Sequence, residues 1–304
     1  MERYLGWDVG GSKSAAVVGT GGGRILWRAE WPSQVGAGPS AMLNDFLRHA
    51  ERARRRFAGL RAVGVSIGGP MNPFTGVIQS PPHLPGWDNV PVADRLRERL
   101  NLPVAVEHDA AACLLAEWLW GGARGTTHAV YLTCGTGCGA GILVDGRIIR
   151  GPSGQTPEVG HIRLEADGPE MFGKRGCVES FCAGEGIGKL AGHMFPHRFG
   201  EGTTTRRLHH LARRRDRQAR AVLAESARRT GQLCALLTDI FSPQVILLGS
   251  LARYFGAGWV GAIRKEFRRE ALTLNAARTV IAPARLGRRL QDLSAIAPCV
   301  HRGL

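Results

Sequence analysis

The chain has 304 residues, of which 40 are Lys or Arg and 25 are Asp or Glu, giving a formal net charge of +15 at pH 7. Hydrophobic residues make up 44% of the chain and charged residues 21%, which excludes a disordered protein and indicates a substantial buried core. This length favours one large or two medium domains. No run approaches the ~20 apolar residues of a membrane span, so we expect no membrane contact.

The ratio of Arg to Lys bears on the origin of the positive charge. Only four of the 40 basic residues are lysine, and an excess of Arg in a chain rich in Gly and Ala favours GC-rich coding as its origin. An Arg-dense run at 206–220 is a candidate nucleic-acid or polyphosphate patch, but we favour a solvated helix face and expect no nucleic-acid partner. Seven cysteines, an odd number, favour free thiols and a cytoplasmic location.

The first third of the chain predicts a hairpin followed by alternating strands and helices. An apolar run at 4–9 ends at Gly10-Gly11 and a second run follows at 13–18, the pattern of two strands joined by a glycine turn. Ser40 is placed to cap the first helix. Trp87 and the length of the Pro- and Gly-rich loop at 70–91 favour a functional role for that loop. Further elements are expected at 24–31 (strand), 62–67 (strand), 70–91 (Pro- and Gly-rich loop), 104–107 (strand) and 109–120 (helix).

The same plan of strand, glycine turn and strand recurs at 129–144, which predicts two related α/β halves. Helices dominate the remainder, with strands at 245–248 and 279–282. The two glycine turns are candidate phosphate sites, because glycines let backbone N–H groups approach an anion. Either turn alone fits an ordinary hairpin, but their matching positions favour one phosphate chain bound by both.

Asp109 follows a buried-looking strand at the start of a helix. It suits the N-cap of that helix, and it also suits a general base at the carboxyl end of a strand, where open α/β sheets bind ligands. The two roles are compatible.

Together these motifs resemble the ROK (repressor, ORF, kinase) family of sugar kinases, within the actin-like ATPase superfamily. The resemblance covers nearly the whole chain and rests on the order and spacing of its motifs. The matching segments are Asp8-Val-Gly-Gly-Ser12-Lys13, Gly68-Gly69-Pro70, Leu84-Pro85-Gly86-Trp87, His108-Asp109-Ala-Ala, Thr133-Cys-Gly-Thr-Gly-Cys-Gly139, Glu158-Val-Gly-His161, Gly176-Cys177-Val178-Glu179 and Leu248-Gly249-Ser250.

The resemblance implies an α/β, two-domain actin-like ATPase (ribonuclease H-like) fold with the active site in the interdomain cleft. A smaller N-terminal domain would comprise 1–111 and about 288–304, since the C-terminal helix should return to it, and a larger domain 112–287. The implied protein is a homodimeric hexose 6-kinase that uses Mg²⁺ and ATP.

The resemblance also implies site residues. Asp109 would be the general base, and Asp8 would hold Mg²⁺ through water. The substrate-binding residues would be Gly69, His108, Asp109, Glu158, His161 and Glu179. The ATP-binding residues would be Asp8, Gly10, Gly11, Ser12, Lys13, Thr133, Gly135, Thr136, Gly137, Gly249 and Ser250.

Two departures from the family pattern concern the sugar side. The family's zinc motif pairs the His of Glu-x-Gly-His with three Cys, but only His161 and Cys177 are retained, with Glu170 and Phe172 at the other positions. Structural zinc needs four ligands, so we expect no zinc. His108 stands where the family has Asn, and its ring differs from an amide in geometry and pH response. These changes favour a nonstandard hexose, for instance an amino sugar such as kanosamine.

Other readings of the same family resemblance are a repressor or a catalytically dead sugar sensor. Only seven residues precede Asp8, which leaves no room here for a helix-turn-helix module. Asp109 and both phosphate turns are retained, which argues against a dead sensor.

Overall fold

A five-stranded sheet forms the centre of the first part of the chain in the computed structural model, which describes residues 2–304. The strand order is β3-β2-β1-β4-β8, with β1–β2 and β2–β3 antiparallel and β1–β4 and β4–β8 parallel. Its strands are β1 (Arg3–Val9), β2 (Lys13–Thr20), β3 (Ile25–Pro32), β4 (Leu60–Ile67) and β8 (Val104–His108). Its helices are α1 (Gly38–Arg56), α2 (Val92–Leu100), α3 (Asp109–Trp120) and α11 (Leu290–His301).

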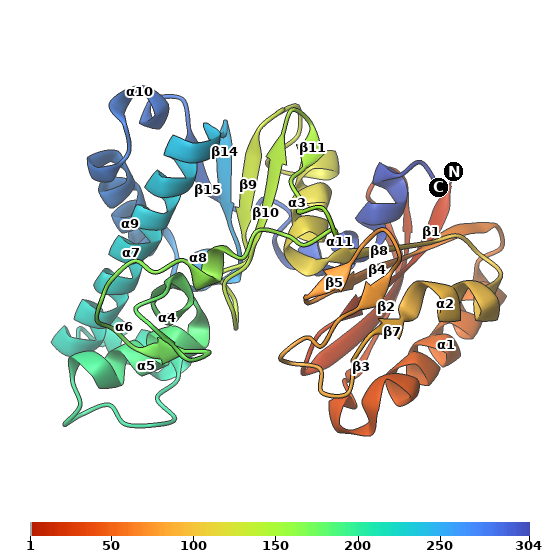
Figure 1. Cartoon of the computed structure of the whole chain (residues 1–304), viewed down its shortest axis with the longest axis horizontal. Coiled ribbons are helices and arrows are strands. Elements are labelled where there is room, and N and C mark those ends of the chain that lie inside the picture. The colour runs from red at the N-terminus through yellow and green to blue at the C-terminus, as the bar shows by residue number, and fades with distance from the viewer. Residues whose placement is uncertain (1) are drawn as a thin grey trace. The chain divides into compact units, whose positions relative to one another are not determined.

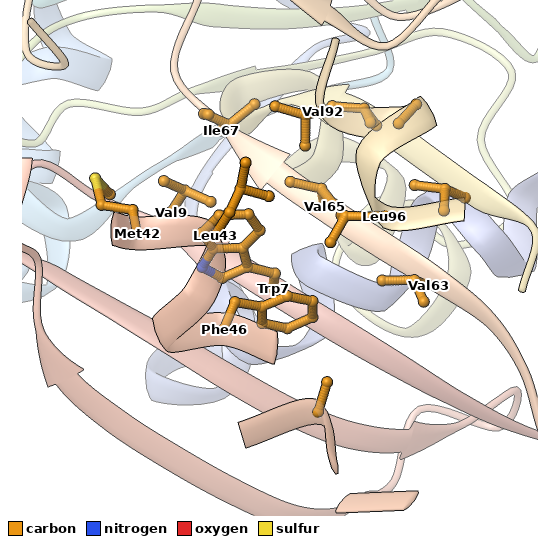
Figure 2. Packing of buried hydrophobic residues seen from close by; sticks show 14 of the residues in the cluster. Trp7, Val9, Met42, Leu43, Phe46, Val63, Val65, Ile67, Val92 and Leu96 are labelled. Carbon is orange, nitrogen blue, oxygen red and sulfur yellow. The ribbon is translucent and has the colours of Figure 1, made fainter. Parts of the chain in front are cut away.

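The two faces of this sheet are covered differently. Leu5, Trp7 and Val9 alternate along β1 and pack against α1, where Trp7 stacks on Phe46 with ring centroids 4.7 Å apart (Figure 2). The opposite face receives α11, which lies directly on the sheet because glycines leave room. A Cβ added at Gly64 would lie 2.0 Å from the Ala295 carbonyl oxygen.

The second part of the chain repeats this sheet plan in the order β11-β10-β9-β14-β15 (Figure 1). The prediction of two related halves is therefore confirmed. Its strands are β9 (Ala129–Leu132), β10 (Ala140–Val144), β11 (Arg147–Ile148), β14 (Val245–Leu248) and β15 (Val280–Pro283), with a separate hairpin of β12 (Glu170–Met171) and β13 (Lys174–Arg175). Its helices are α4 (Val178–Cys182), α5 (Gly184–Met194), α6 (Thr205–Arg213), α7 (Arg217–Phe241), α8 (Ser250–Phe255), α9 (Ala257–Glu270) and α10 (Thr273–Ala276).

The chain forms two compact units along these lines. The first runs to Gly125 and also includes Ile148–Thr156 and Arg285–Leu304; the second comprises Thr126–Arg147 and Pro157–Ala284. The C-terminal helix α11 thus joins the first unit, where it packs on β1, β4 and α3. The whole of α3 lies in the first unit too, beyond the boundary expected at residue 111, because its partners α11, β4 and β8 are there.

Two local expectations are wrong. Ser40 does not cap α1: the helix begins at Gly38 after Ala37, and a proline in its first turn supplies the fixed backbone angle that starts it. The loop at 70–91 is not free of regular structure, since it contains the short antiparallel strands β5 (Met71–Asn72), β6 (Val77–Ile78) and β7 (Val90–Pro91).

Trp87 holds that loop against the sheet. Its side chain is fully buried, and its ring centroid lies 6.3 Å from that of Trp7. Trp87 is therefore a core residue, and a functional role of the loop stays a prediction. All seven cysteines are buried and free, as expected from their number. Within residues 2–304, no helix is both long enough and apolar enough to cross a membrane.

We expect Trp87→Ala to lower the free energy of unfolding by about 3–5 kcal/mol, because it removes a large buried ring and leaves a cavity. Urea denaturation measures this. The matched control is Phe74→Ala in the same loop, where the side chain is 65% exposed and the change should stay within about 0.5 kcal/mol. Equal effects of the two substitutions would contradict the role given to Trp87.

Candidate functional site

The carboxyl ends of three parallel strands bring the motifs of the first unit together. Val9 of β1 pairs with Ile67 of β4, and Ile67 pairs with His108 of β8. The segments that follow these strands, the Gly10 turn, the Gly68–Gly69 loop and Asp109, therefore leave the same edge of the sheet. Open α/β sheets bind ligands at this edge.

The Gly10 turn is tight and its tip is exposed. The Gly10 amide donates to the Lys13 carbonyl (3.0 Å), and a Cβ at Gly10 would lie 2.8 Å from that oxygen. Gly11 and Ser12 are exposed at the tip. Lys13 points to the Glu30 carboxylate (2.9 Å), an exposed ion pair, so its ammonium already has a partner within the unit.

Asp8, just before this turn, is a half-buried carboxylate to which we find no hydrogen-bond donor among residues 2–304. Burial, and next the negative charge of Asp109, raise the pKa of Asp8 to about 8. A cation beside Asp8 would relieve both effects. The residues at this position therefore suit a hard divalent cation.

Asp109 opens α3, but it is not the N-cap of the helix. That position belongs to His108, whose Nδ1 accepts from the Ala110 amide (3.3 Å). Oδ1 of Asp109 accepts from the same amide at 2.6 Å. The Asp109 side chain is 48% exposed, so a substrate hydroxyl could reach its second oxygen.

Gly69 lets the His108 ring approach the second loop of this edge. A Cβ at Gly69 would lie 2.7 Å from Cδ2 of His108. The structure thus brings Gly69, His108 and Asp109 together, as the sequence predicted.

In the second unit, the turn after β9 and the turn after β14 touch. Thr133 Oγ1 accepts from the Gly139 amide (2.8 Å) and closes the first turn, which includes Gly135, Thr136 and Gly137. A Cβ at Gly249 would lie 1.8 Å from the Thr133 carbonyl oxygen, so only glycine fits there. Ser250 Oγ donates to the Cys134 carbonyl (3.2 Å). The predicted nucleotide-side residues of this unit are therefore neighbours.

Glu179 lies behind the same turn. It is largely buried, and Cβ atoms added at Gly137 and Gly160 would lie 3.1 and 2.9 Å from its two carboxylate oxygens. Glu158 and His161 flank Gly160 and are exposed. The second phosphate motif, Glu-x-Gly-His and Glu179 are thus neighbours, although they come from three separate stretches of sequence.

The residues at the family's zinc position do not fit a zinc ion. The Phe172 ring lies against the His161 imidazole, with ring centroids 5.8 Å apart, while Cys177 is buried and Glu170 is exposed. Residues 2–304 contain no cluster of three or more His, Cys, Asp or Glu side chains arranged to hold a metal. His161 is thus held by the aromatic contact and by its backbone, whose carbonyl accepts from Lys174 Nζ (2.5 Å).

Sequence reasoning missed the buried carboxylates Glu107 and Glu117. Glu107 binds Arg150 immediately before the His108–Asp109 turn. Glu117 accepts from the Gly122 amide (2.6 Å) and the Leu286 amide (2.8 Å), tying two distant stretches of the first unit together. An acidic residue inside an apolar strand or helix was the available signal, because a buried charge requires a partner.

The Arg-dense stretch forms α6, a break at Arg215, and the start of α7, which Asp216 caps. Its arginines are exposed, as a solvated helix face requires. The expectation of no nucleic-acid partner stays a prediction.

The sheet order and the paired glycine turns define the actin-like ATPase fold, and the comparisons with known proteins agree. A sequence profile of the ROK family matches residues 4–289, and the chain belongs to this family. It is 33% identical to the ROK hexokinase of Thermus thermophilus, with a TM-score of 0.84 and 97% of each chain covered. A ROK family glucokinase from Streptomyces griseus, solved with glucose and AMPPNP, is 26% identical with a TM-score of 0.80, covering 96% of this chain and 97% of that one.

The curated relatives include two kinds of protein. A glucokinase of Streptomyces coelicolor is 30% identical over 283 residues, covering 88% of both chains. A xylose repressor of Caldicellulosiruptor bescii is 25% identical over 307 residues, covering 96% of this chain and 77% of the repressor. Family membership alone therefore leaves both a kinase and a regulator open.

The raised pKa of Asp8 makes stability depend on pH. Between about pH 4, where an unfolded Asp titrates, and pH 8, the folded state keeps a proton that the unfolded chain has lost, so the free energy of unfolding falls as the pH rises. Asp8→Asn removes this contribution. In metal-free buffer, its stability relative to the wild type should therefore rise from pH 5 to pH 8, as measured by urea denaturation.

The control for this comparison is Asp94→Asn, which changes an exposed carboxylate in α2. A stability difference between Asp8→Asn and the wild type that stays constant with pH would contradict the raised pKa.

Proposed function

We propose that this chain is a sugar kinase that transfers the γ-phosphate of ATP to the 6-hydroxyl of a hexose, with Asp109 as general base. The observation that carries the proposal is an accessible carboxylate at the shared carboxyl edge of β1, β4 and β8, beside a glycine turn suited to phosphate. The similarity to glucokinases, one of them bound to glucose and AMPPNP, supports both substrates.

Asp109 is suited to remove the hydroxyl proton. Its Oδ1 is engaged by the Ala110 amide, which fixes the carboxylate and leaves Oδ2 for the substrate. The proton passes to Oδ2 as the sugar oxygen attacks the γ-phosphorus and ADP leaves. A positioned base of this kind accelerates the reaction by ~10²–10⁴-fold.

The glycine turns would hold the phosphates of ATP. In the first unit the Gly10 amide closes the turn on the Lys13 carbonyl, the amides of Gly11 and Ser12 at its exposed tip would donate to phosphate, and Lys13 adds positive charge. In the second unit the glycine turn of Thr133, Gly135, Thr136 and Gly137 likewise joins two antiparallel strands and would bind phosphate, and Gly249 and Ser250 would lie on the adenosine side. Phosphoryl transfer depends mostly on such positioning and on charge neutralisation.

Asp8 would hold Mg²⁺ through water, since its half-buried carboxylate, close to Asp109, favours a cation. Mg²⁺ bound there would neutralise phosphate charge. No zinc enters the proposal.

The sugar would contact Gly69 and His108 in the first unit and Glu158, His161 and Glu179 in the second. The mostly buried His108, in place of an amide, and the exposed His161, in place of a zinc-oriented imidazole, favour glucose or a glucose-like amino sugar such as kanosamine. A cytoplasmic homodimer belongs to the same proposal and rests on the family resemblance.

An ADP-release assay over several sugars tests the reaction and its substrate. We expect activity with at least one of glucose, glucosamine, N-acetylglucosamine, N-acetylmannosamine, fructose and kanosamine, and an amino sugar to equal or exceed glucose in kcat/KM. Glucose that exceeds every amino sugar tenfold would reject the amino-sugar assignment. Tight sugar binding by calorimetry without any ADP release would favour a sugar-sensing regulator.

Asp109→Asn should lower kcat by ~10²–10⁴, because an amide cannot accept the proton. Its side-chain oxygen can still accept from the Ala110 amide, so the fold and the sugar KM should change little. Steady-state kinetics measure both constants. The control is Asp94→Asn, the same change at an exposed position of α2. A kcat close to that of the wild type would remove Asp109 from the mechanism.

A further inference from the structure

Arg150 belongs to the first unit but lies outside the five-stranded sheet of that unit. It lies in Ile148–Thr156, which packs with the first unit although the segments before and after it belong to the second. Its guanidinium binds both oxygens of Glu107, Nη1 to Oε1 at 2.8 Å and Nη2 to Oε2 at 2.5 Å. The Glu107 side chain is 2% exposed and that of Arg150 14%. This is a buried bidentate ion pair, a charged contact with a strong directional preference.

The ion pair acts on the backbone beside the proposed base. Oε1 of Glu107, one of the two oxygens that Arg150 holds, also accepts from the His108 amide at 3.0 Å. His108 in turn caps α3 through Ala110, the residue that also binds Asp109. An unbroken series of contacts therefore runs from Arg150 through Glu107 to the turn that carries Asp109.

A second cation supports the same strand end. Nη2 of Arg302 donates to the Val106 carbonyl (3.2 Å) and the Pro73 carbonyl (3.1 Å), and lies 4.0 Å from Glu107. Arg302 thus holds the strand through the Val106 carbonyl, whereas Arg150 alone binds both oxygens of the Glu107 carboxylate. The two arginines can therefore be told apart experimentally.

We propose that Arg150 is a positioning residue for catalysis: through Glu107 it fixes the His108–Asp109 turn in the geometry needed for proton abstraction. This inference rests on the proposed function of Asp109. Burying an ion pair adds little stability compared with apolar side chains of similar size, so its particular contribution is orientation. Displacement of a reacting group by ~1 Å can cost ~10²-fold in rate.

The test compares Arg150→Gln, Arg150→Lys and Glu107→Gln with the wild type. Amide hydrogen exchange, followed by mass spectrometry on peptides covering 104–112, reports on the turn without requiring activity. We expect Arg150→Gln to speed exchange there at least about tenfold while other peptides of the first unit change little, and to lower kcat about 10- to 100-fold with the hexose KM within about threefold. Arg150→Lys keeps the charge but cannot bind both carboxylate oxygens in the same way. Its exchange rate at 104–112 and its kcat should therefore lie between those of the wild type and Arg150→Gln.

Two controls separate positioning from general stability. Arg55→Gln removes an arginine from an exposed pair with Glu51 in α1 and should change neither readout. Arg302→Lys should speed exchange in 104–112 less than Arg150→Gln does. If Arg150→Gln fails to fold, Glu107→Gln replaces it, because its amide oxygen can still accept from His108.

Unchanged exchange at 104–112, exchange raised equally throughout the first unit, or an unchanged kcat in an active enzyme would each overturn the positioning role. If the wild type releases no ADP with any sugar, the proposed function fails. The exchange data would still show whether Arg150 holds this turn.

Discussion

Parallel pairing of β1, β4 and β8 is the contact on which the rest of the first unit depends. In register, the three strands end together, and residues about 60 and 40 positions apart in sequence leave one edge of the sheet. The covering helix α11 packs on Gly6 and Gly64, where any larger side chain would meet its backbone or methyl groups. The spacing between sheet and helix therefore depends on two glycines that have no chemical role themselves.

The positive and negative charges of this basic chain lie in different places. The net charge of +15 arises largely from exposed arginines, whereas the chemistry gathers around carboxylates: Asp8 and Asp109 at the sheet edge, and Glu107 behind them. Burial and the negative charge of Asp109 raise the pKa of Asp8, which suits a cation. Glu107 is neutralised by Arg150 inside the same unit. The candidate phosphate sites are backbone turns, so the proposed phosphate binding does not require the arginine excess.

Local pattern predicted much of the fold. The glycine turns, the helix beginning at Asp109 and the strand Val245–Leu248 follow from apolar runs interrupted by glycine, which act over a few residues. The expectation for Ser40 was wrong because a proline one residue earlier starts α1, and the core role of Trp87 was missed because Trp7, which receives its ring, lies 80 residues away. The Glu107–Arg150 pair was missed because nothing in either local sequence names its partner.

The sequence by itself determined the family motifs, the repeated strand–turn–strand plan and the candidate base, because these depend on residue type and short spacing. Only the tertiary structure decided which motifs meet: Gly69 with His108, Gly249 with Thr133, and Glu179 with Gly137 and Gly160. It also gave His161 a phenylalanine neighbour instead of a full set of metal ligands, and gave Arg150 its carboxylate. Such contacts join segments far apart in sequence, so they depend on strand register and helix packing rather than on local pattern.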